Sequence, residues 1–297
     1  MNDSSLKEIP WRRFREFLAP CADRFAVLQE MLEQAGLYWR ALETAGARHL
    51  LTAPLPPEDA PPRRSPPLLV AHYDRAPGSP GANDNSAGAF ILLESAITLK
   101  RSKAEGWTVI FTDKEELGRG QSIMAQGAYA LARELKSLKM DRSKIFCFDA
   151  CGTGDTLIIS TTADYLLKGE EGGEKLQKAA RGLRETALET ARNLGMAKVL
   201  LSPTPFSDDA GFLRAGFAAQ TITMLPSPEC IPLAAALRRN PEFAGALISA
   251  ELRQKSHAAA IPETWRCLNS PSDSHLRLTP QHFRAVSRFA QALCQRE

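Results

Sequence analysis

Four short apolar runs constrain the fold of this chain more than any other feature, because each is rich in β-branched or aromatic residues and helical segments separate them. The runs are LLVAHYD (68–74), WTVIFTD (107–113), KIFCFDA (144–150) and FAAQTITML (217–225). Strands that alternate with helices form parallel sheets that are covered on both faces. The pattern therefore predicts an α/β fold, a three-layer α/β/α sandwich with a mixed, mainly parallel sheet.

The remaining segments predict how the chain is organised around that sheet. Apolar residues at helical spacing predict helices over 86–99, 176–194 and 280–293, and an N-terminal helical segment over about 10–36. Proline-rich residues 53–67 are predicted to form a surface loop.

Length and composition are those of an ordinary globular protein. The chain has 297 residues, of which 44% are apolar and 24% charged, and α/β enzymes of this length commonly form one domain. We expect a single domain over 1–297, with an inserted excursion over about 227–268 that holds a helix near 233–252 and either caps a site or lies inert on the surface.

Charge and hydropathy exclude several classes of partner. The 37 basic residues are scattered among 34 acidic ones, and the formal net charge of +3 marks no nucleic-acid surface. No apolar run reaches the roughly 18 residues of a membrane span, and the start, MNDSSLKEIPWRRF, lacks the apolar core of a signal peptide. We expect a soluble protein with no nucleic-acid or membrane partner. Its compartment stays open, because a removed leader would allow a secreted or periplasmic location.

The first run ends in His72-Tyr73-Asp74, a pattern that occurs at metal sites. Residues two apart in an extended chain point the same way, so Asp74 could orient the imidazole of His72 behind a metal ion. A structural histidine is the alternative. The loop 81–88 (GANDNSAG) follows closely and places Asp84 just before a predicted helix. Helix capping by Asp84 or Asn85 is the alternative there.

Two further runs also end in carboxylates. Glu115 and Glu116 follow the second run, and because adjacent side chains diverge, one can bind a metal while the other acts as general base on the attacking water. A solvated charge pair is the alternative. Asp149 ends the third run, flanked by Cys147 and Cys151, which either bind zinc or lie buried at the strand end. Ligands bind at the carboxyl ends of parallel strands, so we predict a shared metal site.

These motifs, together with SDDAGFLRAGFAAQTIT (207–223), resemble the zinc aminopeptidase and glutaminyl cyclase family, metallopeptidase family twenty-eight, over about residues 67–285. The resemblance implies a zinc-exopeptidase fold that hydrolyses amide bonds at free amino termini of peptides or aminoacyl amides. It implies zinc as the cofactor, with His72 and Asp149 on one ion, Glu116 on another, and Asp84 bridging both. Glu115 would be the general base and Asp74 the partner of His72.

One departure from the family pattern concerns its last metal ligand, a histidine that opens a segment of the form H-T-P-x-D-T. Asn269 stands at that position in NSPSDS (269–274), and an amide oxygen is a poorer zinc ligand than imidazole. We therefore expect one complete zinc site and a weakened second one. His257 and His275 are possible replacements, and surface histidines are the alternative.

The departure leaves three functions open. A metal-dependent aminopeptidase-like hydrolase is the leading prediction. A glutaminyl cyclase is the nearest enzyme alternative, but the resemblance implies that cyclases hold one zinc with the residues matching Asp84, Glu116 and the missing histidine. A non-catalytic binding protein or pseudoenzyme on the same fold is the third, and it rests on Asn269 alone.

Overall fold

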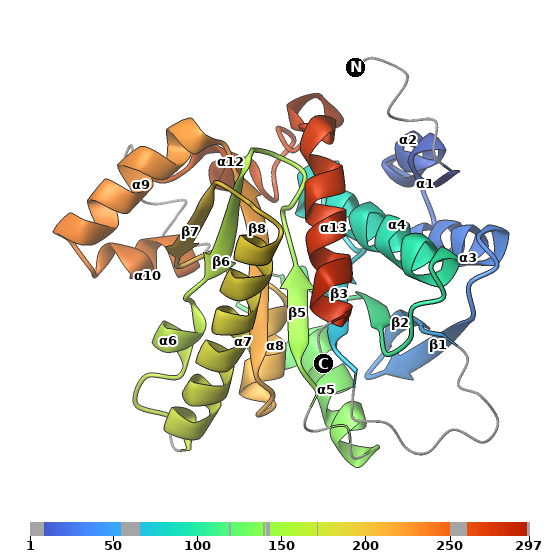
Figure 1. The fold of residues 1–297 in the computed structure, drawn as a ribbon, viewed down its shortest axis with the longest axis horizontal. Helices are drawn as coiled ribbons and strands as arrows, with labels where there is room; N and C mark the ends of the chain where they lie inside the picture. Colours follow the sequence, from blue (N-terminus) through green and yellow to red (C-terminus); the bar gives the residue numbers. More distant parts are fainter. Residues whose placement is uncertain are drawn as a thin grey trace.

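A computed structural model describes residues 9–54, 66–118, 120–138, 140, 143–170, 172–249 and 260–295. One eight-stranded sheet runs through it in the order β1-β2-β4-β3-β5-β8-β6-β7 (Figure 1). The strands are β1 (Trp39–Thr44), β2 (Ala47–Thr52), β3 (Leu68–His72), β4 (Thr108–Thr112), β5 (Ile145–Phe148), β6 (Thr156–Ser160), β7 (Val199–Ser202) and β8 (Ala219–Leu225).

The four predicted strands form the centre of the sheet. β3 pairs in parallel with both β4 and β5, and β5 pairs in parallel with β8. Every residue of these four strands is buried, which explains their continuous apolar sequences. The antiparallel β1–β2 pair lies at one edge, and β6 runs antiparallel to β8 near the other. The prediction of a mixed, mainly parallel sheet is confirmed.

Alternate residues of the central strands point into two separate apolar clusters. Leu69, Val109 and Phe146 belong to the first cluster, with helices α4 (Gly88–Arg101), α7 (Gly173–Asn193) and α13 (Phe283–Cys294). Leu68 and Ile145 belong to the second, with α5 (Gly127–Ser137), α6 (Ala163–Leu166) and α8 (Asp208–Arg214). The period of two along each strand thus gives the sheet two covered faces, the predicted three-layer sandwich.

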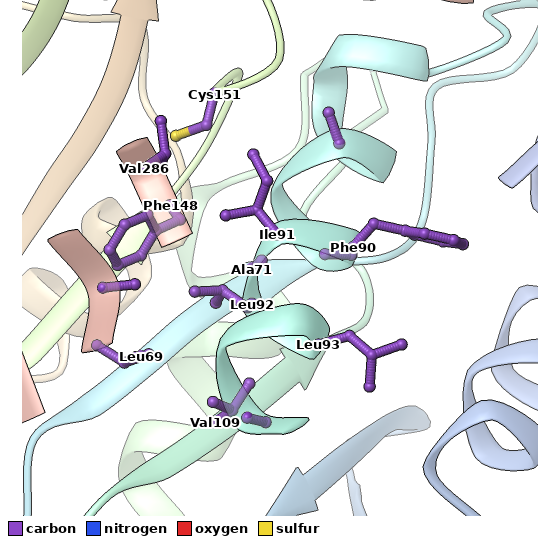
Figure 2. Packing of buried hydrophobic residues seen from close by; sticks show 14 of the residues in the cluster. Leu69, Ala71, Phe90, Ile91, Leu92, Leu93, Val109, Phe148, Cys151 and Val286 are labelled. Carbon is purple, nitrogen blue, oxygen red and sulfur yellow. The ribbon is translucent and has the colours of Figure 1, made fainter. Parts of the chain in front are cut away.

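Figure 2 shows the first of these interfaces at close range. Ile91 and Leu92 of α4 lie over Ala71 and Leu69 of β3, and all four side chains are buried. This contact fixes α4 on the sheet, and with it the loop that precedes the helix.

The N-terminal segment contains three helices: α1 (Ile9–Arg12), α2 (Phe14–Phe17) and α3 (Arg24–Gln34). The break after α2 contains Pro20, which lacks the N–H that a continuing helix needs. Asp23 then starts α3 by accepting a hydrogen bond from the backbone N–H of Ala26 at 3.0 Å. Trp11 stacks on Phe283 of α13 with ring centroids 4.6 Å apart, which docks this segment on the first cluster.

The excursion packs against the far edge of the sheet. It contains α9 (Ser227–Arg239), α10 (Phe243–Ile248) and α12 (Glu263–Cys267), and residues 250–252 of its predicted helix lie outside the described ranges. Leu233, Leu247 and Trp265 bury themselves against Ile158 of β6 and Leu225 of β8. The short helices are η1 (Ala82–Ala87), η2 (Ile123–Ala125), η3 (His275–Arg277) and η4 (Pro280–His282). Within the described ranges, no helix combines the length and the apolarity that a membrane crossing requires.

Candidate metal centre

The site lies where three neighbouring parallel strands end at the same edge of the sheet. His72 is the last residue of β3, Asp149 follows β5, and the loop that carries Glu115 and Glu116 follows β4. The strand order β4-β3-β5 therefore places the histidine between the two carboxylate-bearing segments.

His72, Asp84 and Asp149 form the tightest group in the site. The His72 side chain is fully buried, and its Nε2 lies 3.1 Å from Asp84 Oδ1 and 3.6 Å from Asp149 Oδ1. Among the described residues, neither nitrogen of His72 nor Asp149 Oδ1 has a hydrogen-bond partner. Buried polar atoms are rarely left unpaired, so these atoms are arranged for a ligand that binds imidazole and carboxylate together.

The loop that carries Asp84 is held by Asp273, which is distant in sequence. The Asp273 carboxylate accepts hydrogen bonds from the backbone N–H groups of Asn83 at 2.8 Å and Asp84 at 3.0 Å. Asn85 donates from Nδ2 to the carbonyl of Phe148 at the end of β5, at 2.7 Å. Helix α4 begins after this loop without any side-chain cap, so capping does not account for Asp84 or Asn85.

Arg24 ties the same region together from the N-terminal segment. This buried guanidinium donates from Nη1 to the carbonyl of Tyr73 and from Nη2 to that of Pro80, both at 2.9 Å. Tyr73 follows His72, and Pro80 begins the loop that carries Asp84. Helix α3 therefore contributes to the relative placement of the two candidate ligands.

Asp74 has two functions in this geometry. Its Oδ1 lies 3.4 Å from His72 Nδ1, a long contact behind the imidazole. Its oxygens also accept hydrogen bonds from the backbone N–H groups of Glu115 at 3.2 Å and Glu116 at 3.0 Å. Burial alone would raise the pKa of Asp74, but His72 and these N–H groups outweigh burial and lower it. Asp74 thus stays ionised while it holds the carboxylate loop against β3.

Glu115 and Glu116 form a second group with His72, and one ligand atom from each lies within 4.8 Å of the others. Glu115 Oε2 is 4.0 Å from His72 Nε2, and Glu115 Oε1 accepts a hydrogen bond from Gln126 Nε2 at 3.1 Å. Glu116 Oε1 is buried without a hydrogen-bond partner in the described structure. The sequence predicted that these side chains lie at one edge of the sheet, and the structure brings them together there.

The electrostatics of the cluster favour a cation. Burial, followed by the charge of Asp84, raises the pKa of Glu116 to about 9. Burial also raises the pKa of Glu115 well above its usual value, with the neighbouring carboxylates adding to it against the opposing effect of His72. Carboxylates this crowded resist ionisation unless positive charge is added. Imidazole nitrogen and carboxylate oxygen are ligands that zinc accepts, so His72, Asp84 and Asp149 fit a zinc ion.

Asn269 differs from the other predicted ligands, because it is exposed to solvent and has a left-handed backbone with φ of 58°. Its segment is attached to the site through Asp273, four residues later. His275 begins η3 and is half-buried, and the structure does not group it with the metal-ligating side chains of the described residues. His257 lies outside the described residues. Cys147 and Cys151 are buried free thiols, as expected of strand-end cysteines.

Three buried residues near the site were not singled out from the sequence: Asp273, Gln126 and Asp208. Asp208 Oδ2 accepts a hydrogen bond from Thr112 Oγ1 at 2.6 Å, and burial raises the pKa of Asp208 to about 7. Two sequence signals were present for Asp208: its place in the family-like segment 207–223, and the pair Asp208-Asp209 in the first turn of an apolar helix, which helix capping also produces.

Comparison with known proteins shows that this chain has the fold of zinc-dependent exopeptidases. A model of peptidase family M28 matches residues 52–277, and the chain therefore belongs to that family, as predicted. Glutaminyl cyclase from Porphyromonas gingivalis is 18% identical with a TM-score of 0.66, over 98% of this chain and 96% of that one. The Legionella pneumophila LapA aminopeptidase is 16% identical with a TM-score of 0.62, over 98% of this chain and 72% of that one.

A zinc aminopeptidase from Bacillus subtilis is 20% identical with a TM-score of 0.53 over 83% of this chain, which spans only 49% of that enzyme. A search of curated proteins found no match. These identities show a shared fold, and the family assignment makes the chain a member of a metal-dependent peptidase family.

Proposed function

We propose that this protein is a metal-dependent, aminopeptidase-like hydrolase that cleaves amide bonds next to free amino termini. The observation that carries the proposal is the convergence of His72 Nε2 on Asp84 and Asp149, with unpaired buried atoms on His72 and Asp149. The family match and the aminopeptidase neighbours support the same class.

His72, Asp84 and Asp149 would hold the first zinc ion, and Glu116 would face a second position with Asp84. A bound zinc ion supplies a Lewis acid that polarises the carbonyl of the scissile amide. Asp74 keeps His72 in place from behind and fixes the backbone of Glu115 and Glu116. The chain's own residues therefore pre-arrange the ligands before any ion binds.

Glu115 acts as the general base in this proposal. Its Oε1 is engaged by Gln126, while its Oε2 faces His72 at 4.0 Å. A bound metal ion would favour the ionised form of this buried carboxyl, and Oε2 can then accept a proton from an attacking water. The same carboxyl group then delivers that proton to the leaving amine. Glu115 lies outside the group formed by His72, Asp84 and Asp149, and in the second group, with His72 and Glu116, the proposal gives the ligand role to Glu116.

The charge of the site suits an amino-terminal substrate. Around His72 lie the carboxyl groups of Glu115, Glu116 and Asp84, and Asp208 is buried close by, within contact of Thr112 at the end of β4. A protonated α-amino group would add to the positive charge of a bound metal ion in offsetting these carboxylates. A free carboxylate terminus would be repelled, which favours cleavage from the amino end.

Glutaminyl cyclisation is the second candidate, favoured by one observation. The P. gingivalis cyclase matches this chain over almost the full length of both proteins. Against it, Asn269 is exposed, and it stands where the family resemblance implies a histidine of the single zinc position. Peptides with amino-terminal glutamine separate the two activities, because hydrolysis releases free glutamine whereas cyclisation leaves a pyroglutamyl end.

The test is a panel of aminoacyl amides and short peptides, including glutaminyl ones, assayed with zinc, cobalt or manganese. The proposal expects metal-dependent release of the amino-terminal residue, abolished by a chelator and restored by the ion. Blocking the α-amino group by acetylation should prevent cleavage. Absence of turnover with every metal would overturn the proposal and favour a non-catalytic binding protein on this fold.

A further inference from the structure

Gln126 occupies an unusual place for a long polar side chain. It directly precedes helix α5, is 3% exposed, and lies between the carboxylate loop after β4 and the start of α8. Its Nε2 donates to Glu115 Oε1 at 3.1 Å, with the carbonyl oxygens of Glu115 and Ser207 each at 3.5 Å. The shortest of these contacts is the one to the carboxylate of the proposed general base.

We propose that Gln126 is a positioning residue that selects which oxygen of Glu115 performs proton transfer. The inference rests on the proposed function, in which Glu115 is the base. By engaging Oε1, Gln126 leaves Oε2 as the oxygen that faces His72. A carboxylate held at one oxygen cannot rotate freely, so its second oxygen keeps one direction relative to the substrate.

The surroundings of Gln126 determine which end of its side-chain amide, Nε2 or Oε1, faces Glu115. With the opposite orientation, Gln126 Oε1 would meet the Glu115 carboxylate oxygen, and two acceptors would repel each other. In the observed orientation Oε1 is buried without a hydrogen-bond partner among the described residues. A buried unpaired oxygen is unfavourable, so packing alone does not explain a glutamine here, whereas donation to Glu115 does.

Two glycines allow close packing around the start of α5, where Gln126 lies. A Cβ on Gly127 would lie 1.9 Å from the carbonyl oxygen of Asp113, so only glycine lets α5 begin against the end of β4. A Cβ on Gly211 of α8 would lie 2.9 Å from Gln126 Oε1. The absence of a side chain at Gly211 therefore leaves room both for the backbone of α5 at Tyr129, 2.8 Å from such a Cβ, and for the Gln126 amide.

A neutral amide also suits the chemistry better than a charged donor. A lysine or arginine at this place would neutralise Glu115 and weaken it as a base, whereas an amide orients the carboxylate without adding a charge. Gln126 thus sets the direction of the base while leaving the charge of the site unchanged.

The test is Gln126→Met, which keeps the length of the side chain and removes the donor. We expect kcat to fall on the order of 10²-fold, as for a misplaced catalytic group, with KM, zinc content and thermal midpoint close to wild type. Gln177→Met is the matched control, because Gln177 Nε2 donates to the carbonyl of Asp164 on α6 and Gln177 is not near Glu115. This control should keep full activity.

Crystal structures of wild type and Gln126→Met give a readout that does not depend on turnover. We expect the Glu115 carboxylate to rotate or to occupy two positions in the variant. If wild type cleaves no substrate, the proposed function fails and these structures alone decide the positioning role. An unmoved Glu115 carboxylate with kcat near wild type would overturn the inference, as would a fall in activity that follows loss of zinc or stability while the carboxylate stays in place.

Discussion

The two candidate metal positions of this protein are built in different ways. His72 and Asp149 stand at the ends of central strands, and Asp84 is fixed by Asp273 through two backbone hydrogen bonds. The second position relies on Glu116, which is held through its backbone by Asp74, and on the segment of Asn269, which is exposed.

The two positions differ in how strongly the fold constrains their candidate ligands. Replacing His72 or Asp149 would disturb buried strand ends, whereas an exposed loop residue such as Asn269 can change without loss of the core. We therefore infer that this chain keeps one strong metal position and that its second position is weak.

Glu115→Gln should give the largest effect on the reaction. The substitution keeps the size and removes the base, so we expect activity on amino-terminal amides to fall by about 10² to 10⁴-fold with zinc retained. Glu116→Gln should lower both the rate and the affinity for a second ion, which separates base from ligand. Steady-state kinetics together with metal analysis measures both quantities, and equal activity in wild type and Glu115→Gln would remove Glu115 from the mechanism.

Asn269→His should strengthen metal binding at the weak position, because it places an imidazole there. We expect zinc content to rise from one ion per chain toward two, because imidazole is a better zinc ligand than an amide. Ser272→His is the control, since it adds an exposed imidazole to the same turn. Unchanged stoichiometry and affinity in Asn269→His would mean that another residue already fills the position.

His49 gives a smaller, pH-dependent effect on the carboxylate loop. Its buried Nδ1 accepts a hydrogen bond from the backbone N–H of Asp113 at 3.2 Å, and burial lowers its pKa to about 4. Below the unfolded pKa of about 6.5 the unfolded chain binds a proton at His49 that the folded chain excludes, so the contribution of His49 to stability falls as pH drops from about 6.5 to about 4.

The His49 contribution should fall by on the order of 2 kcal/mol between about pH 7 and about pH 5. Buried carboxyls with a raised pKa, such as Asp208, change stability in the opposite direction, so the difference between wild type and a His49 variant isolates this contribution. Urea unfolding of metal-free protein at several pH values measures it, with His49→Gln as the comparison. His49→Gln should be less stable near neutral pH but lose less stability on acidification. A pH dependence identical to wild type would show that His49 is not the group responsible.

The sequence predicted the central fold well because buried parallel strands are apolar throughout. It did not predict β1, β2, β6 and β7. For β1 and β7 the reason is partial exposure, which leaves their sequences without a fully buried apolar run. The predicted helix over 10–36 is broken near Pro20, where helical spacing of apolar residues continues across a residue that cannot extend a helix.

The candidate site could also be predicted only in part, because contacts between residues far apart in the sequence are not visible before the chain folds. Five candidate residues can be identified in the sequence because they lie at strand ends or in a glycine-rich loop: His72, Asp84, Glu115, Glu116 and Asp149. The contact between Asp273 and the backbone of Asp84 joins residues 189 positions apart, and it becomes visible only when the chain is folded. The roles of the five candidate residues in metal binding and catalysis remain predictions.

Zinc titration of chelator-treated protein, followed by calorimetry and metal analysis, tests the central claim most directly. Wild type should bind one zinc ion tightly and a second one far more weakly. Asp84→Asn should lose the tight ion, whereas Asn269→Ala should keep it. Two ions bound with equal affinity in wild type, or a tight ion that survives in Asp84→Asn, would contradict the unequal metal centre described for this fold.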